Sequence, residues 1–221
     1  MANPTPKAFL PVNGQPLFTF SLRTIARLPS LQSLILVVAS EWQAKAREIS
    51  DALKLHIRLR VTPGGEERQD SVAAGLALVE ESDLVLVHDA ARPFATLDLF
   101  NRCIAAAAES GAAIAAIPAK DTIKLAGPEQ TIRETIDRSG VWLAQTPQVF
   151  RVDLLKRAYE RARRDQILGT DEAALVELLG APVRLVVGEE ANRKITTPDD
   201  LEWAEWRAPE LVGSQRFRVK R

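Results

Sequence analysis

Apolar runs that read as buried strands alternate with stretches of helical spacing along this chain. A run at 33–40 precedes a helical stretch at 41–53, and an alternating run at 55–61 precedes a loop at 62–70. Because strand–helix alternation joins parallel strands by crossovers, it predicts an α/β fold with a doubly wound, mostly parallel sheet. The strand that includes Val85, Leu86 and Val87 is expected to be covered on both faces. The other predicted helices span 16–28, 71–81, 96–110, 151–163, 171–179 and 198–206, and the other strands 112–119 and 183–187.

Residues 120–145 interrupt this alternation. They contain short strand-like pieces, a Gly-Pro turn at 127–128 and a Ser-Gly turn at 139–140. This pattern predicts a β-arm that leaves the main body. With no internal repeat and no low-complexity linker, the sequence predicts one domain over residues 1–221 with the arm at 120–145 inside it.

Composition excludes several classes of protein. The 221 residues hold 29 Lys+Arg and 29 Asp+Glu, so no overall positive charge indicates nucleic-acid binding. One cysteine cannot form a disulfide within the chain, and two histidines are too few for a His-rich metal site. No apolar run approaches the ~20 residues of a membrane span. The beginning of the chain lacks the apolar core of a signal peptide, so we expect a cytoplasmic protein without membrane contact.

The segment HDAARPF, residues 88–94, places polar side chains directly after a strand. Ligands of open α/β sheets bind beyond the carboxyl ends of the strands. Asp89 can hold Mg²⁺ on a nucleotide, and Arg92 offers a planar fork for a phosphate. The alternative is that Asp89 and Arg92 only pair across a turn. His88 is interpreted as a packed, hydrogen-bonded residue rather than as a catalyst.

Three more segments carry residues suited to anions. In PGGEERQDS the two glycines allow close backbone approach, Arg68 can reach a phosphate, and Asp70 or Ser71 can cap the next helix. In NRKITTPDD, Lys194 lies between a strand and a helix, for which Thr197 and Pro198 form a natural start. Lys7 lies in PTPK. Each segment alone also fits a plain turn or a solvated lysine.

Together the segments HDAARPF, PGGEERQDSVAAGL, DTIK, DRSGVWLAQTPQVF, TDEAALVE and NRKITTPDDL resemble the 2-C-methyl-D-erythritol 4-phosphate cytidylyltransferases of the non-mevalonate isoprenoid pathway, over about residues 6–206. The resemblance implies a Rossmann-like nucleotidyltransferase that joins CTP to methylerythritol phosphate with Mg²⁺, working as a homodimer with exchanged arms.

The resemblance also implies roles for individual residues. Gly65, Glu66 and Ser71 would line the cytidine pocket, Asp89 would face Mg²⁺ and the nucleotide, and Arg92 and Thr170 would contact the sugar phosphate. Lys7 and Lys194 would be catalytic and flank the triphosphate, and Thr122 and Arg138 would reach into the partner subunit's site. Such a reaction needs placed positive charge rather than a general base, because the attacking phosphate oxygen is already ionised.

The sequence departs from the family pattern at its beginning. The pattern starts with an apolar strand and a Gly-rich loop carrying an arginine, and only six residues precede Lys7 here. Either the start lies upstream, or the chain is a short form. We expect the chain as given to turn over CTP slowly and to expose an apolar groove.

Three rival functions are considered. A ribitol 5-phosphate cytidylyltransferase shares HDA-x-RPF, and a nucleotide-binding protein without turnover would keep the scaffold. A dinucleotide-dependent dehydrogenase is disfavoured because no GxGxxG follows a predicted strand.

Overall fold

The structure is a computed structural model that describes the backbone of residues 5–216 and the side-chain surroundings of residues 5–208. Its internal contacts group the chain into two compact units. Of the described residues, 5–78, 88–100 and 191–216 form the first unit, and 79–87 and 101–190 form the second. The prediction of a single nucleotidyltransferase domain stays a prediction.

The first unit contains a two-stranded parallel sheet with flanking helices. Strand β3 (Ser33–Val38) pairs with β4 (Arg58–Pro63). Every second residue of β3 is buried, because neighbouring side chains point to opposite faces. The remaining elements are η1 (Lys7–Phe9), β1 (Pro11–Val12), β2 (Gln15–Pro16), α1 (Phe18–Ile25), η2 (Ser40–Trp42), α2 (Gln43–Ala52), α3 (Arg68–Leu76) and α7 (Pro198–Arg216).

A small core in this unit packs helix α7 against β1 and the residues just after it. Phe94, Ile195 and Ala204 are buried together with Val12 and Leu17. The start of α7 has the predicted cap, because Thr197 Oγ1 accepts a hydrogen bond from Asp200 N at 3.2 Å. The short segment just before α7 is therefore held by the burial of Ile195 and by the cap at Thr197.

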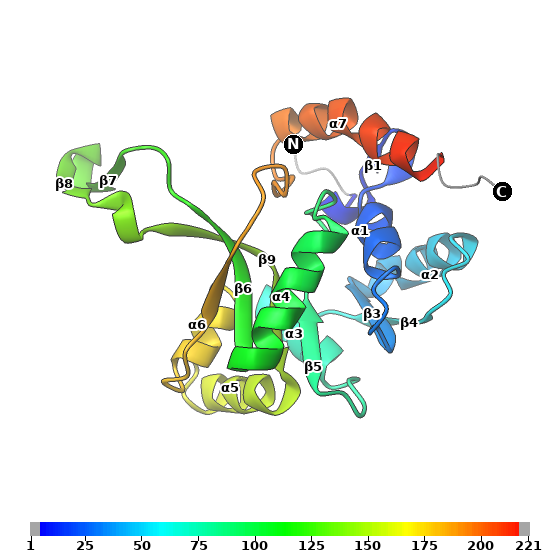
Figure 1. The fold of residues 1–221 in the computed structure, drawn as a ribbon, viewed down its shortest axis with the longest axis horizontal. Coiled ribbons are helices and arrows are strands. Elements are labelled where there is room, and N and C mark those ends of the chain that lie inside the picture. Colours follow the sequence, from blue (N-terminus) through cyan, green and yellow to red (C-terminus); the bar gives the residue numbers. More distant parts are fainter. Residues whose placement is uncertain (1–4, 217–221) are drawn as a thin grey trace. The chain divides into compact units, whose positions relative to one another are not determined.

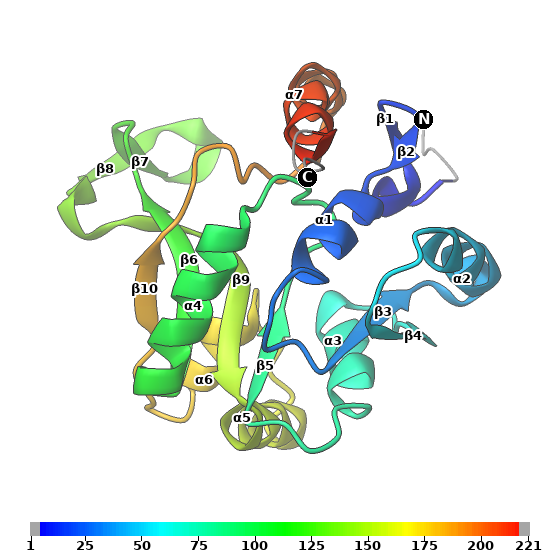
Figure 2. The same cartoon turned by 45° about the vertical axis from the view of Figure 1, so that its right-hand side comes forward.

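The second unit is built on a four-stranded sheet in the order β10-β6-β9-β5. Three strands run in one direction and β9 runs against them, which fits the predicted mostly parallel sheet. Residues 101–110 of helix α4 (Leu97–Ser110) cover one face and α6 (Glu172–Glu177) the other (Figure 2). The other elements are β5 (Leu84–Val87), β6 (Ala112–Pro118), β9 (Trp142–Arg151), α5 (Val152–Arg164) and β10 (Arg184–Val187).

The predicted arm is present as an antiparallel hairpin. Strand β7 (Ile123–Ala126) pairs with β8 (Ile132–Ile136), joined by η3 (Pro128–Gln130) and followed by η4 (Arg138–Gly140). Figure 1 shows the hairpin projecting from the sheet beyond the end of β6. The arm is thus an extension of the second unit's sheet.

Several predicted boundaries are wrong. The central strand β9 was not foreseen, because its first residues were assigned to the arm and its cluster of Gln, Thr and Pro does not read as a buried strand. All four residues of β5 are partly buried, and β5 pairs with β9 at one edge of this four-stranded sheet, so its predicted cover on both faces stays a prediction. Helix α3 begins within the stretch read as a loop.

Candidate functional site

In the turn that follows β5, two side chains form hydrogen bonds to the carbonyl oxygen of Arg92. The ring of His88 bonds to this oxygen through Nε2 at 3.0 Å, and Ser21 Oγ donates to it at 3.2 Å. Because a carbonyl only accepts, Nε2 carries the ring proton. Burial lowers the pKa of His88 to about 4, although the bond to Arg92 opposes the shift. His88 is therefore a neutral donor that shapes the turn, as the sequence indicated.

The segment that carries Lys194 is held against this turn by two further hydrogen bonds. Ile195 N donates to Ala91 O at 2.8 Å, and Arg92 Nη1 donates to Asn192 O at 2.8 Å. Ile195 and Asn192 are both buried. These bonds bring residues that are distant in the sequence together at one corner of the first unit.

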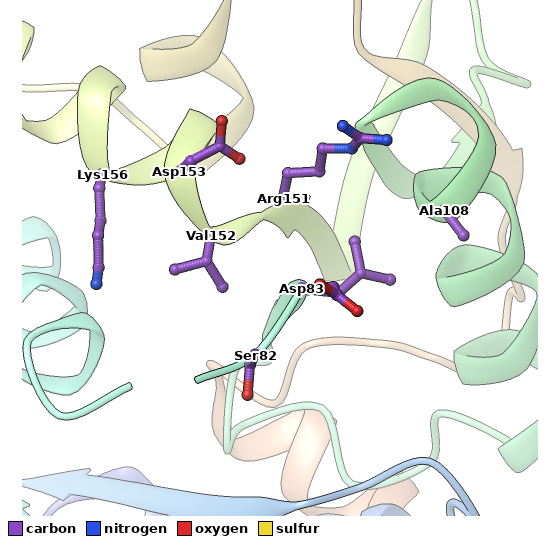
Figure 3. A pocket seen from close by; sticks show the side chains of 8 residues that line it. Ser82, Asp83, Ala108, Arg151, Val152, Asp153 and Lys156 are labelled. Atoms are coloured by element: carbon purple, nitrogen blue, oxygen red, sulfur yellow. The ribbon is translucent and has the colours of Figure 1, made fainter. Parts of the chain in front are cut away.

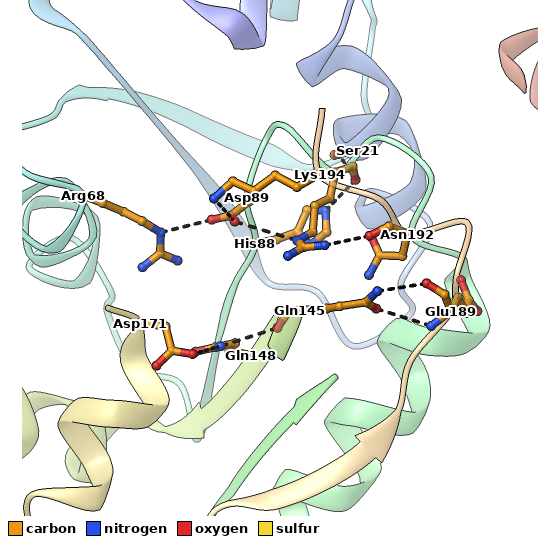
Figure 4. Close-up of polar contacts among 11 residues, drawn as sticks. Ser21, Arg68, His88, Asp89, Gln145, Gln148, Asp171, Glu189, Asn192 and Lys194 are labelled. Carbon is orange, nitrogen blue, oxygen red and sulfur yellow. Dashed lines mark hydrogen bonds and ion pairs between the residues drawn. The ribbon is translucent and has the colours of Figure 1, made fainter. Parts of the chain in front are cut away.

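Three cations converge on one carboxylate at this corner (Figure 4). Lys194 Nζ lies 2.9 Å from Asp89 Oδ2, Arg68 Nε lies 3.1 Å from Asp89 Oδ1, and Arg92 Nε lies 3.9 Å from Asp89 Oδ2. We call these four residues the Asp89 cluster. Burial alone would raise the pKa of Asp89, but the charges of Arg68 and Lys194 outweigh it and lower that pKa below its ordinary value. Asp89 is therefore a carboxylate.

The members of the cluster differ in their access to solvent. The side chains of Asp89 and Arg92 are 14% and 12% exposed, whereas those of Arg68 and Lys194 are 35% and 43% exposed. Burial lowers the pKa of Arg92, and Asp89 partly offsets the shift. Arg68 and Lys194 are consequently the members of the cluster most accessible to an anion, whereas Asp89 and Arg92 are largely buried.

The glycine loop lies closely against the start of α3. An added Cβ at Gly65 would lie 2.3 Å from Asp70 Cβ, and one at Gly64 would lie 2.5 Å from Ser71 Oγ. Gly65 N donates to Ser71 Oγ at 3.2 Å. The predicted cap at Asp70 or Ser71 is wrong in its position. Glu67 is the cap residue and Asp70 completes a capping box, which makes Arg68 the first residue of the helix.

The structure brings together three of the predicted site residues, Asp89, Arg92 and Lys194. The pairing of Asp89 with Arg92 that the sequence left open is present, within a larger set of charges. Arg68 was noted only as able to reach a phosphate, and it belongs to the cluster. The cluster does not include four other predicted residues of the first unit, namely Lys7 at the start of η1, Gly65, Glu66 and Ser71.

The remaining predicted residues belong to the second unit. Thr122 is exposed just before β7, and Arg138 begins η4, where its Nη1 donates to the carbonyl of Lys120. Thr170 is exposed just before the cap of α6. Their predicted roles stay predictions.

Sequence reasoning overlooked two buried glutamines of β9, Gln145 and Gln148 (Figure 4). Gln145 Nε2 donates to Glu189 O at 3.0 Å, and Glu189 N donates back to Gln145 Oε1 at 3.3 Å. Gln148 Nε2 donates to Asp171 Oδ2 at 2.8 Å. An amide in an otherwise apolar strand was the signal in the sequence, since buried polar groups need partners.

A cavity of about 620 Å³ lies in the second unit, at the beginnings of β5 and α5 (Figure 3). It contains none of the predicted site residues, and its charges are mixed, so no role is assigned to it. Its lining consists of Ser82, Asp83, Leu84, Ala108, Arg151, Val152, Asp153 and Lys156.

The described part of the chain lacks two kinds of feature. Within residues 5–216, no group of three or more His, Cys, Asp or Glu is placed to hold a metal ion. Over the same part of the chain, no helix is both long enough and apolar enough to cross a bilayer. A single carboxylate such as Asp89 still suits Mg²⁺, which usually takes one or two carboxylates and fills its shell with substrate phosphates and water.

An α/β fold with positively charged side chains just after a strand is typical of proteins that bind phosphates. The profile of the family described as IspD, 2-C-methyl-D-erythritol 4-phosphate cytidylyltransferase, matches residues 1–208. The chain belongs to this family.

Relatives support the assignment. A 2-C-methyl-D-erythritol 4-phosphate cytidylyltransferase of Syntrophus aciditrophicus is 42% identical over 207 residues, covering 93% of this chain and 88% of the relative. The crystal structure of 4-diphosphocytidyl-2C-methyl-D-erythritol synthase from Anaerococcus prevotii has a TM-score of 0.85 at 31% identity, covering 91% of this chain and 93% of that one. The Thermus thermophilus cytidylyltransferase has a TM-score of 0.81 at 36% identity, covering 92% and 94%.

Proposed function

We propose that this protein transfers the cytidylyl group of CTP to 2-C-methyl-D-erythritol 4-phosphate, which yields 4-diphosphocytidyl-2-C-methyl-D-erythritol and pyrophosphate. The single observation that carries the proposal is the Asp89 cluster, in which three cations converge on one corner of a protein of the IspD family. Two of these cations are accessible and can turn to a polyanion.

The chemistry requires charge rather than proton transfer. A phosphate oxygen of the sugar phosphate attacks the α-phosphorus of CTP, a new P–O bond forms, and the bond to the β-phosphate oxygen breaks to release pyrophosphate. The attacking oxygen is ionised near neutral pH and needs no base. Positive groups that meet the developing charge lower the barrier, and each of them commonly contributes about 10²–10³-fold in rate.

The cluster suggests how the cations are supplied. In the structure Lys194 and Arg68 bond to the two oxygens of Asp89. A triphosphate offers the same donors more negative charge, so both side chains exchange Asp89 for phosphate oxygens. Arg92 keeps its bond to Asn192 O and serves the sugar phosphate. In this proposal Lys7 also meets the triphosphate.

The cytosine end of the nucleotide is assigned to the glycine loop. Gly65, Glu66 and Ser71 supply backbone and side-chain groups for the base and ribose. Only glycine fits at position 65, because an added Cβ would lie 2.3 Å from Asp70 Cβ, and this close approach keeps the loop beside the first turn of α3.

The proposal includes Mg²⁺ held by Asp89. When bound, the ion neutralises phosphate charge and helps to align the reacting groups. Asp89 would hold the ion if Lys194 and Arg68 turned from it to the triphosphate. The lowered pKa of Asp89 keeps its side chain ionised, which a metal ligand requires.

A cytoplasmic homodimer completes the proposal. The arm carries exposed apolar side chains, Leu125 and Ile132, which a partner subunit would cover. Thr122 and Arg138, at the base of the arm, would then reach the partner's site. Light scattering of the full chain and of a variant with Ile132→Asp tests this: the variant is expected to be monomeric.

Pyrophosphate release from CTP tests the proposed function. The purified chain is given CTP and Mg²⁺ with methylerythritol phosphate or, in a parallel reaction, with ribitol 5-phosphate. Release only with methylerythritol phosphate supports the proposal, and release only with ribitol 5-phosphate overturns it. CTP binding without any release would instead indicate a protein that keeps the scaffold without turnover.

A further inference from the structure

The buried amide of Gln148 donates one hydrogen bond and accepts another, and both partners lie at the start of α6. Its Nε2 donates to Asp171 Oδ2 at 2.8 Å, and its Oε1 accepts from Ala173 N at 3.2 Å. The residue is 1% exposed. One glutamine in the middle of a strand thus fixes both the side chain that caps α6 and the backbone of its first turn. We call Gln148, Asp171 and Ala173 the Gln148 clamp.

The clamp determines the conformation of the short segment before α6. Asp171 uses its second oxygen, Oδ1, to accept from Ala174 N at 2.9 Å, so both of its carboxylate oxygens are engaged. Just upstream, a Cβ at Gly169 would lie 2.6 Å from Leu175 Cδ2, which keeps this glycine close against the helix. Thr170 lies between these two fixed residues and is itself exposed.

We propose that Gln148 is a positioning residue for the acceptor sugar phosphate, acting through Asp171 on the hydroxyl and backbone of Thr170. The inference rests on the proposed function and on the role that the resemblance implies for Thr170, which is contact with methylerythritol phosphate. Gln148 does not touch the substrate. It sets the orientation of the segment that does, and a site on a short loop depends on such support to keep its geometry.

The directions of the two hydrogen bonds in the clamp can be tested by substitution. Only a side chain with a donor and an acceptor on one planar group satisfies Asp171 and Ala173 together. In Gln148→Glu, one oxygen still accepts from Ala173 N, but the other faces a carboxylate. In Asp171→Asn, two NH₂ groups meet unless Gln148 turns over, and then Ala173 N loses its acceptor.

The double variant Gln148→Glu with Asp171→Asn restores the two bonds of the clamp, with the direction of the bond to residue 171 reversed, and gives up the long bond of 3.5 Å that Gln148 Nε2 donates to Gln145 O. The amide introduced at position 171 would donate to the carboxylate introduced at position 148. That carboxylate would also accept from Ala173 N, and Asn is as good a helix cap as Asp. The formal charge equals that of the wild type. The experiment is therefore steady-state kinetics of the wild-type chain, both single variants and the double variant.

We expect each single variant to raise the KM for methylerythritol phosphate about tenfold, the effect of one broken buried hydrogen bond. KM for CTP and kcat should stay within about twofold, because loss of a binding contact alone leaves the chemical step unchanged. The double variant should return to within about twofold of the wild-type KM, as expected when paired changes restore one interaction.

Tyr159→Phe is the matched control. It removes another buried hydrogen bond of α6, from Tyr159 Oη to Glu172 Oε1 at 3.1 Å, without touching the clamp. We expect it to lower the melting temperature and to leave KM for both substrates unchanged.

Two failures are distinguishable. If the wild-type chain releases no pyrophosphate, the proposed function fails. If the wild type is active but the single variants keep the wild-type KM for methylerythritol phosphate, or behave like Tyr159→Phe, Gln148 is a structural residue and the inference is overturned.

Discussion

The Asp89 cluster and the Gln148 clamp differ in charge and in exposure to solvent. In the cluster, Arg68 and Lys194 carry full charges, and their side chains are 35% and 43% exposed. In the clamp, a neutral amide donates and accepts at 1% exposure. Charges near solvent can exchange one partner for another at little cost, because water screens both arrangements. A buried neutral amide has no such alternative and is therefore suited to holding a fixed geometry.

This comparison predicts that changes in the cluster affect turnover and that changes in the clamp affect a single KM. The largest effect is expected for Lys194→Met, which removes an accessible cation that stabilises charge in the transition state. We expect kcat/KM for CTP to fall about 1000-fold, the upper range for loss of one such group. Steady-state pyrophosphate release measures it.

Lys45→Met is the matched control, because Lys45 forms an exposed pair with Glu48 at 2.9 Å. Its kinetics should match the wild type, since exposed pairs contribute little. An equal loss in both variants would show that Lys194 has no special role.

Asp89→Asn comes next. The variant keeps the size of the side chain but loses the charge that would hold Mg²⁺ and that orders Lys194 and Arg68. With Mg²⁺ present, kcat should fall about 100-fold. Wild-type kcat in the variant would remove Asp89 from the proposed mechanism.

A smaller effect concerns His88 and pH. The folded-state pKa is about 4 and the ordinary value is 6.5, so between these values the unfolded chain binds a proton that the folded chain does not. The part of the free energy of unfolding that depends on the neutral form of His88 is thus fully present above pH 6.5, and it is lost as pH falls toward 4. By about pH 5 the loss is about 2 kcal/mol.

Urea unfolding of the wild type and of His88→Gln at about pH 7.5 and about pH 5 measures this loss. The glutamine keeps a donor for Arg92 O but does not titrate. The wild type should lose more stability than the variant between the two pH values, and equal losses would show that His88 is not the cause.

The smallest effect belongs to the cap of α7. Thr197→Ala removes the acceptor of Asp200 N and should lower the free energy of unfolding by about 1 kcal/mol. Turnover at low temperature should stay unchanged. Thermal unfolding checks the first expectation, and a large kinetic effect would mean that this cap also positions Lys194.

The sequence was informative where side-chain type and local spacing decide the structure. The strand before Asp89, the helix start at Thr197–Pro198 and the hairpin of the arm follow from apolar runs, capping residues and turns. The convergence of Asp89, Arg92 and Lys194 could be expected from their places beside strands. It is achieved by backbone bonds such as Ile195 N to Ala91 O, which no local pattern reveals.

The parts that sequence reasoning missed depend on long-range pairing. Strand β9 is central in its sheet but reads as polar, because Gln145 and Gln148 satisfy loops that are distant in the sequence. Likewise, Arg68 is an ordinary first-turn residue of α3 until Asp89 is brought beside it. Burial and partner choice, rather than local propensity, determine both cases.

The central claim is that nucleotide phosphates and Asp89 compete for the same cations. Calorimetric titration of CTP in the absence of Mg²⁺ into the wild type, Asp89→Asn and Lys194→Met tests it most directly. The account predicts that Asp89→Asn binds CTP at least as tightly as the wild type, because a competing carboxylate is gone, and that Lys194→Met binds about tenfold more weakly. If Asp89→Asn weakens binding as much as Lys194→Met does, the account is contradicted.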